Sequence, residues 1–127
     1  MSIHVLQVED QEDIRDIVSI SMGTDPEIEL TTASSGLEAL DILSGGLQPD
    51  VILMDVMMPE IDGLETLSRL RGLPGHSETP VIFMTARTME HERRHYLDLG
   101  AVGVIPKPFD PLTLASSVRS ILAAARP

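Results

Sequence analysis

Short apolar segments recur along the chain, and longer segments with more widely spaced apolar residues separate them. The segments at 51–54 and 81–84, VILM and VIFM, are apolar throughout. A strand with one face in water would instead alternate between apolar and polar residues, so uninterrupted runs indicate parallel strands covered on both faces. The pattern predicts five strands, at residues 3–8, 28–32, 51–54, 81–84 and 102–105.

The intervening segments show the spacing of amphipathic helices. Ile14, Ile17, Val18 and Met22 recur at i, i+3, i+4 and i+8, and Gly23 follows where such a helix would end. Similar spacing predicts four more helices. One lies around Leu37–Leu43 after the capping residues Ser34–Ser35, and one around Leu64–Leu70 after Gly63. The others run from Met89 to Leu99, before Gly100, and from Leu114 onward, after a cap at Asp110 and a first-turn proline at Pro111.

Strands and helices therefore alternate five times, which indicates an α/β protein with a parallel sheet and helices on both of its faces. Right-handed crossovers leave few possible strand orders. We expect a doubly wound, five-stranded parallel sheet in the order 2-1-3-4-5, the flavodoxin-like arrangement. Ligands of such sheets bind beyond the carboxyl ends of the strands, so the residues that follow each strand become the candidates for function.

Composition narrows the possible functions. A length of 127 residues fits one domain, and 43% hydrophobic residues suffice for a core. The formal net charge of −11 opposes direct binding to nucleic acid, and the chain has no cysteine for disulfides or thiol chemistry. We see no apolar run long enough to insert into a membrane and no signal peptide at the start of the sequence, which indicates a cytoplasmic protein.

Polar and charged residues follow four of the five predicted strands. Glu9 and Asp10 follow the first strand, Asp55 the third, Thr85 the fourth and Lys107 the fifth. Three carboxylates at one edge of a sheet repel one another, and a hard cation such as Mg²⁺ with oxygen ligands relieves that repulsion. A lysine and a hydroxyl facing them would accommodate a phosphoryl group, and a carboxylate can act as the nucleophile that receives it. Acidic loops also occur for solubility alone, but the clustering of all five residues at strand ends favours a site.

Four segments give the chain a resemblance to a known family. They are VEDQ at 8–11, LMDVMMPEIDG at 53–63, MTA at 84–86 and GAVGVIPKPF at 100–109. In this order and spacing they resemble the receiver domain of bacterial two-component response regulators, over essentially the full length. The resemblance implies a single receiver domain over 1–127, similar to the single-domain chemotaxis regulators. The sequence ends after the fifth predicted helix, so we expect no output domain; a stand-alone protein and a piece excised from a longer regulator or hybrid kinase both remain open.

The resemblance also implies roles for individual residues. Asp55 would accept a phosphoryl group from a phosphohistidine on a sensor histidine kinase or a histidine phosphotransferase. Thr85 would hydrogen-bond that group, and Lys107 would pair with it. The domain would then change its affinity for a downstream protein target, catalysing only its own phosphotransfer and dephosphorylation.

A magnesium site is implied in the same way. Glu9, Asp10 and Asp55 would bind Mg²⁺ together with the backbone carbonyl of Met57. Pro59 and Gly63 would shape the loop beneath the site. The Lys107–Pro108 peptide bond would be cis, as receivers usually have it.

The sequence departs from the usual receiver pattern at several positions. Glu9 stands where the family commonly has the first of two aspartates, and its extra methylene would shift that carboxylate relative to the metal. Val104 stands where many receivers have an aromatic residue that swings on activation. Met57 and Arg87 occupy two positions near the phosphoryl group that vary across the family and tune its lifetime, and Arg87 could shield or contact the phosphate.

The segment HERRH at 91–95 matches the H-E-x-x-H zinc motif of metalloproteases. It falls on the fourth predicted helix, away from the strand-end site, and we expect Leu97 to face the sheet and both histidines to face solvent. Partner recognition and plain solvated surface both remain open for this helix. In receivers, the fourth helix, fifth strand and fifth helix often contact partners, which suggests as recognition residues Arg93, Arg94, His91, His95 and Val104.

Other functions remain open at this point. The same fold could serve as a protein-binding module that does not use phosphate, or as a sink that drains phosphate from a relay. A haloacid-dehalogenase-like phosphatase would need an acid two residues after the nucleophile, where the chain has Met57. A flavin carrier would need a phosphate-binding loop and stacking aromatics, and neither is visible.

Overall fold

The computed structural model describes residues 2–125, which form five strands and five helices that alternate along the chain. Within these residues, no helix is both long enough and apolar enough to cross a membrane. The strands are β1 (Ile3–Val8), β2 (Ile28–Ala33), β3 (Val51–Asp55), β4 (Val81–Thr85) and β5 (Gly103–Pro106). The helices are α1 (Glu12–Met22), α2 (Gly36–Ser44), α3 (Gly63–Leu70), α4 (Glu90–Asp98) and α5 (Leu114–Ala125).

The strands form one parallel sheet in the order β2-β1-β3-β4-β5, as the sequence predicted. Val8 of β1 pairs with Met54 of β3, so the residues that follow them meet at the same edge of the sheet. β3 and β4 extend one residue further than predicted. Asp55 and Thr85 are therefore the last residues of their strands, which ties both to the sheet ladder.

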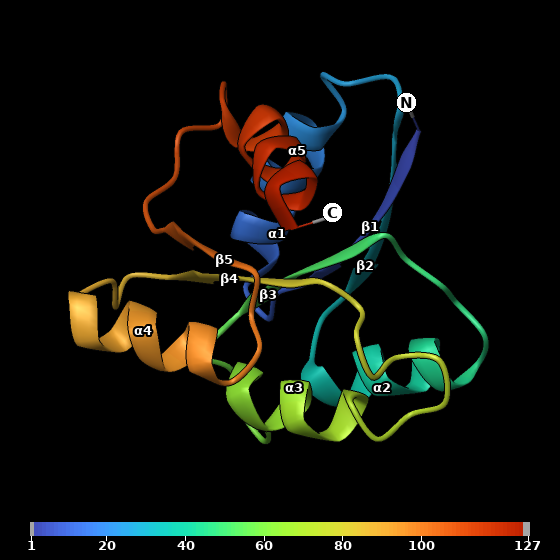
Figure 1. Ribbon diagram of the computed structural model, residues 1–127. Helices are drawn as coiled ribbons and strands as arrows, with labels where there is room; N and C mark the ends of the chain where they lie inside the picture. The colour runs from blue at the N-terminus through green and yellow to red at the C-terminus, as the bar shows by residue number, and fades with distance from the viewer. Residues whose placement is uncertain (1, 126–127) are drawn as a thin grey trace.

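Helices cover both faces of the sheet (Figure 1). α1 and α5 lie together on one face, and α2, α3 and α4 lie on the other. Each face has its own buried cluster: Val5, Leu53 and Ile82 pack with side chains of α1 and α5, whereas Leu6 and Phe83 pack with side chains of the other three helices. β3 and β4 are buried at every position, which explains their uninterrupted apolar sequences.

Capping residues predicted one helix start correctly and another wrongly. The Ser35 hydroxyl accepts a hydrogen bond from the backbone N–H of Glu38 at 3.0 Å and caps α2 as predicted. The prediction for α5 was wrong in detail. The helix begins at Leu114, and Asp110 instead caps a preceding turn that contains Pro111, accepting a hydrogen bond from Leu112 N–H at 2.9 Å.

The expected orientation of α4 was also wrong. Tyr96, not Leu97, is the residue of α4 that faces the sheet: it is buried, and its ring packs edge-to-face on Phe83 with centroids 5.5 Å apart. Leu97 is 48% exposed. α4 contains few apolar residues, so an aromatic contact with the sheet determines its orientation where apolar spacing could not.

Candidate functional site

Three carboxylates meet at the carboxyl ends of β1 and β3. One oxygen each of Glu9, Asp10 and Asp55 lies within 4.8 Å of the others, and among residues 2–125 this is the one such group of three or more metal-binding side chains. Glu9 and Asp55 are buried, and Asp10 is half-buried. The strand order brings them together because β1 and β3 are neighbours in the sheet although distant in the sequence.

Lys107 contacts two of these acids from the end of β5. Its Nζ lies 2.8 Å from Glu9 Oε1 and 3.3 Å from Asp55 Oδ2. The side chains of Glu9 and Asp55 are only 3% and 7% exposed, and that of Lys107 is 16% exposed. Charges held this far from water interact more strongly than surface pairs do. The ammonium therefore acts on both carboxylates at once.

Burial and charge shift the acidities of this pair. Burial is the main reason that the pKa of Glu9 is raised to about 7, the charge of Asp55 adds to the effect, and the hydrogen bond from Lys107 opposes it. Burial by itself lowers the pKa of Lys107, but the hydrogen bond to Glu9 and the charge of Asp55 outweigh it and raise that pKa above its ordinary value. Lys107 is therefore firmly cationic, whereas Glu9 holds its proton unusually well.

Local backbone contacts fix the positions of the acids. The N–H of Gln11 donates to Glu9 Oε2 at 3.3 Å, and Arg15 Nη1 donates to the carbonyl of Glu9 at 2.8 Å. The N–H of Met57 donates to Asp55 Oδ1 at 3.3 Å. Asp55 thus has Lys107 on one oxygen and a backbone N–H on the other, which sets the orientation of its carboxylate.

Thr85 lies at the end of β4, between the strands that carry Asp55 and Lys107. It is 1% exposed, its carbonyl accepts a hydrogen bond from the N–H of Lys107 at 2.9 Å, and its hydroxyl oxygen accepts one from the N–H of Arg87 at 3.0 Å. Because Oγ1 is the acceptor in that contact, the hydroxyl hydrogen remains available for a further acceptor.

The loop between β3 and α3, which also contains Pro59, packs tightly below the site. The N–H of Gly63 donates to the carbonyl of Val56 at 2.8 Å, and a Cβ at this glycine would collide with the carbonyl oxygen of Asp55. Gly63 is therefore required for the close approach of α3 to the end of β3. The Lys107–Pro108 peptide bond is cis, as expected from the resemblance.

The donor set suits a hard divalent cation. Carboxylate oxygens from three residues converge, and Asp10 Oδ1 is buried without a hydrogen-bond partner among the described residues. A buried polar oxygen without a partner is costly, and a bound cation would satisfy it. The residues thus fit Mg²⁺, with the carboxylates of Glu9, Asp10 and Asp55 as its ligands.

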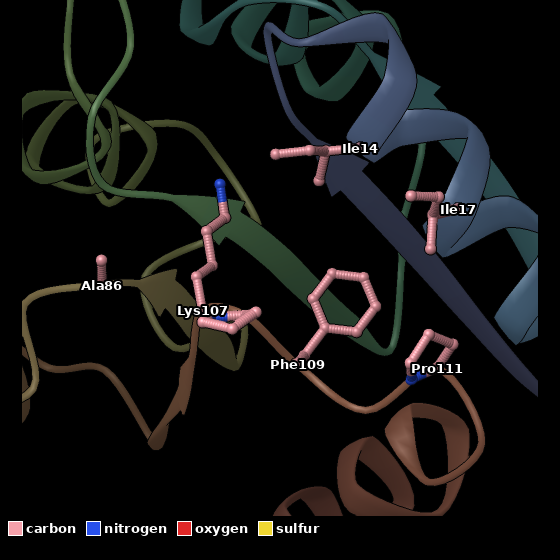
Figure 2. A pocket seen from close by; sticks show the side chains of 7 residues that line it. Ile14, Ile17, Ala86, Lys107, Phe109 and Pro111 are labelled. Atoms are coloured by element: carbon pink, nitrogen blue, oxygen red, sulfur yellow. The ribbon is translucent and has the colours of Figure 1, made fainter.

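An apolar hollow of about 390 Å³ adjoins the acidic cluster. Figure 2 shows Ile14 and Ile17 of α1 on one side of it and Phe109 and Pro111 on the other. The side chain of Lys107 also lines the hollow, and its Nζ contacts Glu9 and Asp55. A molecule that fills the hollow would therefore lie directly beside the site.

The HERRH segment lies on α4, and the side chains of His91 and His95 are exposed as expected. The described residues bring no third metal-binding side chain to this pair. Arg93 and Arg94 are exposed too, but so are Glu90 and Asp98, so this helix presents a surface of mixed charge. Val104 does not belong to that surface: it is 8% exposed and packs in the core with Tyr96.

The sequence predicted the acids and the lysine of the site but not two contacts and one hollow. It did not foresee that Glu9 binds Lys107 directly, that Arg87 pairs with Glu92 at 3.6 Å, or that Phe109 and Ile17 help to line a hollow beside Lys107. The apolar residues at 14 and 17 gave no separate signal for the hollow, because their spacing indicates only the apolar face of a helix and the structure alone shows that Ile17 is 44% exposed.

Comparisons with known proteins agree on one family. The sequence profile described as "Response regulator receiver domain" matches residues 5–119. Response regulator MprA of Mycobacterium tuberculosis is 37% identical over 128 residues, which cover all of this chain and 54% of that protein. Response regulator SaeR of Staphylococcus epidermidis is 35% identical over 120 residues, or 94% of this chain and 50% of that protein. The chain thus spans about half the length of the curated relatives it matches.

Solved structures give the same result over the whole domain. Chemotaxis response regulator CheY4 of Vibrio cholerae superposes with a TM-score of 0.85 at 32% identity, covering 95% of this chain and 99% of that one. The receiver domain of Francisella response regulator 1452 superposes with a TM-score of 0.85 at 28% identity, covering 98% of this chain and 100% of that one.

Proposed function

The chain belongs to the response regulator receiver domain family, and from this premise we propose that Asp55 accepts a phosphoryl group and that the domain thereby changes its affinity for a protein target. The observation that carries the proposal is the position of the Lys107 ammonium, 3.3 Å from Asp55 Oδ2 and 2.8 Å from Glu9 Oε1. One cation thus spans the proposed nucleophile and a proposed metal ligand.

The transfer begins from a phosphohistidine on a sensor kinase or a histidine phosphotransferase. A carboxylate oxygen of Asp55 forms a bond to phosphorus while the N–P bond breaks, and the electron pair of that bond returns to the imidazole nitrogen. Lys107 balances negative charge on the phosphoryl oxygens, and the Thr85 hydroxyl donates to one of them. Mg²⁺, when bound by Glu9, Asp10 and Asp55, supplies further positive charge to the phosphoryl oxygens.

The apolar hollow supports a location for the donor protein. A donor helix that inserts an apolar side chain between Ile17 and Phe109 would hold its phosphohistidine beside Lys107 and Asp55. Burying apolar surface provides affinity without adding charge to a site that is already acidic. We place the donor on this face, formed by α1 and the segment between β5 and α5.

Phosphorylation changes the surface that follows Thr85 and leads to α4. The phosphoryl group attracts the hydroxyl of Thr85, whose oxygen is bonded to the N–H of Arg87 at the start of the segment leading to α4. A shift there biases the surface around α4 toward one of two arrangements, and this is how the domain signals. It catalyses only its own phosphorylation and dephosphorylation.

Two experiments test the proposal. Incubation with Mg²⁺ and phosphoramidate, a small donor with an N–P bond, should give an acyl phosphate signal in ³¹P NMR that the Asp55→Asn variant lacks. No acyl phosphate in the wild type, or an equal signal in Asp55→Asn, would favour a binding module that does not use phosphate.

For the donor face, Ile17→Lys should slow transfer from a phosphorylated histidine kinase but not from phosphoramidate. Ile20→Lys is the matched control, because Ile20 lies on the same helix, is 73% exposed and does not line the hollow. Equal slowing by both variants would contradict the assignment of the hollow.

A further inference from the structure

Arg87 is attached to the site through its backbone and to α4 through its side chain. Its N–H donates to Thr85 Oγ1 at 3.0 Å, which holds its Cα next to the hydroxyl proposed to bind the phosphoryl group. Its guanidinium Nη1 lies 3.6 Å from Glu92 Oε2, and the arginine side chain is 65% exposed. Among the described residues, Glu92 is the one carboxylate within ion-pair distance of this guanidinium, and the contact is loose.

The carboxylate of Glu92 has other stabilising contacts besides the guanidinium of Arg87. Its side chain is only 18% exposed, and its other oxygen, Oε1, accepts a hydrogen bond from the N–H of Met89 at 3.3 Å. Glu92 lies in the first turn of α4, where the partial positive charge of the helix N-terminus favours a carboxylate. The carboxylate thus keeps a local stabilising partner when Arg87 leaves.

The negative charge of the phosphorylated site would attract the guanidinium of Arg87. When Mg²⁺ is bound, Glu9 must give up its proton to act as a ligand, so a phosphoryl group on Asp55, together with Glu9 and Asp10, carries about four negative charges in total. Mg²⁺ and Lys107 together supply three positive charges, which leaves roughly one negative charge unbalanced within the site. Arg15 already donates to the carbonyl of Glu9 at 2.8 Å, so it is engaged. Arg87 follows Thr85 by two residues, and its contact with Glu92, 3.6 Å from one carboxylate oxygen, is longer than a hydrogen bond.

We propose that Arg87 has two alternative partners. In the unphosphorylated protein its guanidinium pairs with Glu92, and phosphorylation of Asp55 moves it from Glu92 to the phosphoryl oxygens. The planar guanidinium matches two phosphoryl oxygens at once, and a dianion attracts it more strongly than one carboxylate does. After the transfer, the first turn of α4 displays a carboxylate without its cation, so the phosphorylation state reaches α4 as a change of charge. The inference rests on the proposed function of Asp55.

Binding of beryllofluoride, a non-covalent phosphoryl mimic, tests the inference in the presence of Mg²⁺. Arg87→Gln should weaken beryllofluoride binding about tenfold, the loss of one charge-assisted contact. Glu92→Gln keeps an oxygen that can accept from Met89 but removes the competing charge, so it should tighten binding roughly threefold. Arg94→Gln is the matched control: Arg94 is an exposed arginine of α4 paired with Glu90 at 3.0 Å, and its loss should leave binding unchanged.

A double-mutant cycle separates competition from a structural role of Glu92. In the Arg87→Gln background, Glu92→Gln should no longer tighten binding, because the competition it relieves is already gone. Equal affinities of wild type and Arg87→Gln, or weaker binding by Glu92→Gln alone, would overturn the inference and leave the proposed function of Asp55 intact. Failure of wild-type protein to bind beryllofluoride would instead count against the proposed function itself.

Discussion

The ammonium of Lys107 lies closer to Glu9 than to Asp55: Nζ is 2.8 Å from Glu9 Oε1 and 3.3 Å from Asp55 Oδ2. The longer side chain of glutamate allows the residue after β1 to reach across the site to the lysine. Glu9 is therefore both a candidate metal ligand and the main partner of Lys107. We expect it to position the ammonium over Asp55 while leaving the Asp55 carboxylate free to react.

The raised pKa of Glu9 predicts a pH-dependent stability in metal-free protein. A group whose pKa rises to about 7 on folding stabilises the folded state most below its ordinary pKa, and that stability is lost as pH rises toward 7. We expect the free energy of unfolding of metal-free wild type, measured relative to Glu9→Gln by urea titration, to fall by on the order of 1 kcal/mol between pH 5 and pH 8, after allowance for solvent screening. Saturating Mg²⁺ should remove this difference. A flat difference across the pH range in metal-free protein would contradict the assignment.

The ion pair between Asp25 and Arg119 should contribute stability with the opposite pH dependence to that of Glu9. Arg119 Nε lies 2.5 Å from Asp25 Oδ2, and the hydrogen bond from Arg119 is the main reason that the pKa of Asp25 is lowered. A depressed pKa stabilises the folded state above the ordinary pKa of the group, and that stability is lost as pH falls through the folded value. Asp25→Asn should therefore lower the melting temperature at pH 6 but have little effect at pH 3. An equal loss at both values would mean that the pair does not stabilise the fold through its charge.

Replacing Gln7 with an apolar residue should stabilise the fold. It is 2% exposed on β1, and both polar atoms of its amide are buried without a hydrogen-bond partner among the described residues. Methionine has a similar shape without the cost of burying an amide, so Gln7→Met should raise the free energy of unfolding by about 1–2 kcal/mol. Chemical denaturation measures the change, and a loss of stability would show that the amide has partners in solution.

Replacing Arg71 should lower the stability of the fold through contacts away from the acidic site. Its guanidinium donates to the carbonyls of Thr79 at 2.6 Å and His76 at 3.2 Å and reaches that of Gly100 at 3.4 Å, which joins two loops at the opposite end of the sheet. Arg71→Met should cost about 2–3 kcal/mol of stability, because the carbonyls of the buried residues His76 and Thr79 lose a charged donor.

Arg69→Met is the control for Arg71→Met. Arg69 lies two residues earlier and forms an exposed i,i+4 pair with Glu65, which contributes little to stability. Thermal unfolding of both variants should show a clear drop for Arg71→Met and almost none for Arg69→Met. Similar values for the two would show that the contacts of Arg71 do not join the loops energetically.

Apolar runs determine which parts of this structure can be predicted from sequence. VILM and VIFM predicted buried strands, and the alternation with helices left few strand orders. The usual one was expected and is confirmed, and it brings Asp55 together with the acids after β1. The orientation of α4 was not predictable in this way, because Tyr96, Leu97 and Leu99 offer competing apolar faces on a mostly polar helix. Packing of Tyr96 on Phe83 decides between them.

Contacts between flexible side chains lay beyond sequence reasoning. Glu9 and Lys107 are separated by 98 residues, and their direct bond depends on rotamers that only the packed site selects. The same holds for Arg87 and Glu92, whose pairing depends on the path of the segment between β4 and α4. Sequence spacing could indicate which residues meet at the edge of the sheet but not which atoms bond there.

The most direct test of the account is the site and metal dependence of phosphorylation. Protein incubated with acetyl phosphate and Mg²⁺ would be measured by intact mass spectrometry, and the modified residue would be located by borohydride reduction of the acyl phosphate and peptide sequencing. The account predicts a gain of one phosphoryl group, located at Asp55, that is strongly reduced by chelation of Mg²⁺ and by Lys107→Met. A modification at another residue, or undiminished labelling in Asp55→Asn, would contradict it.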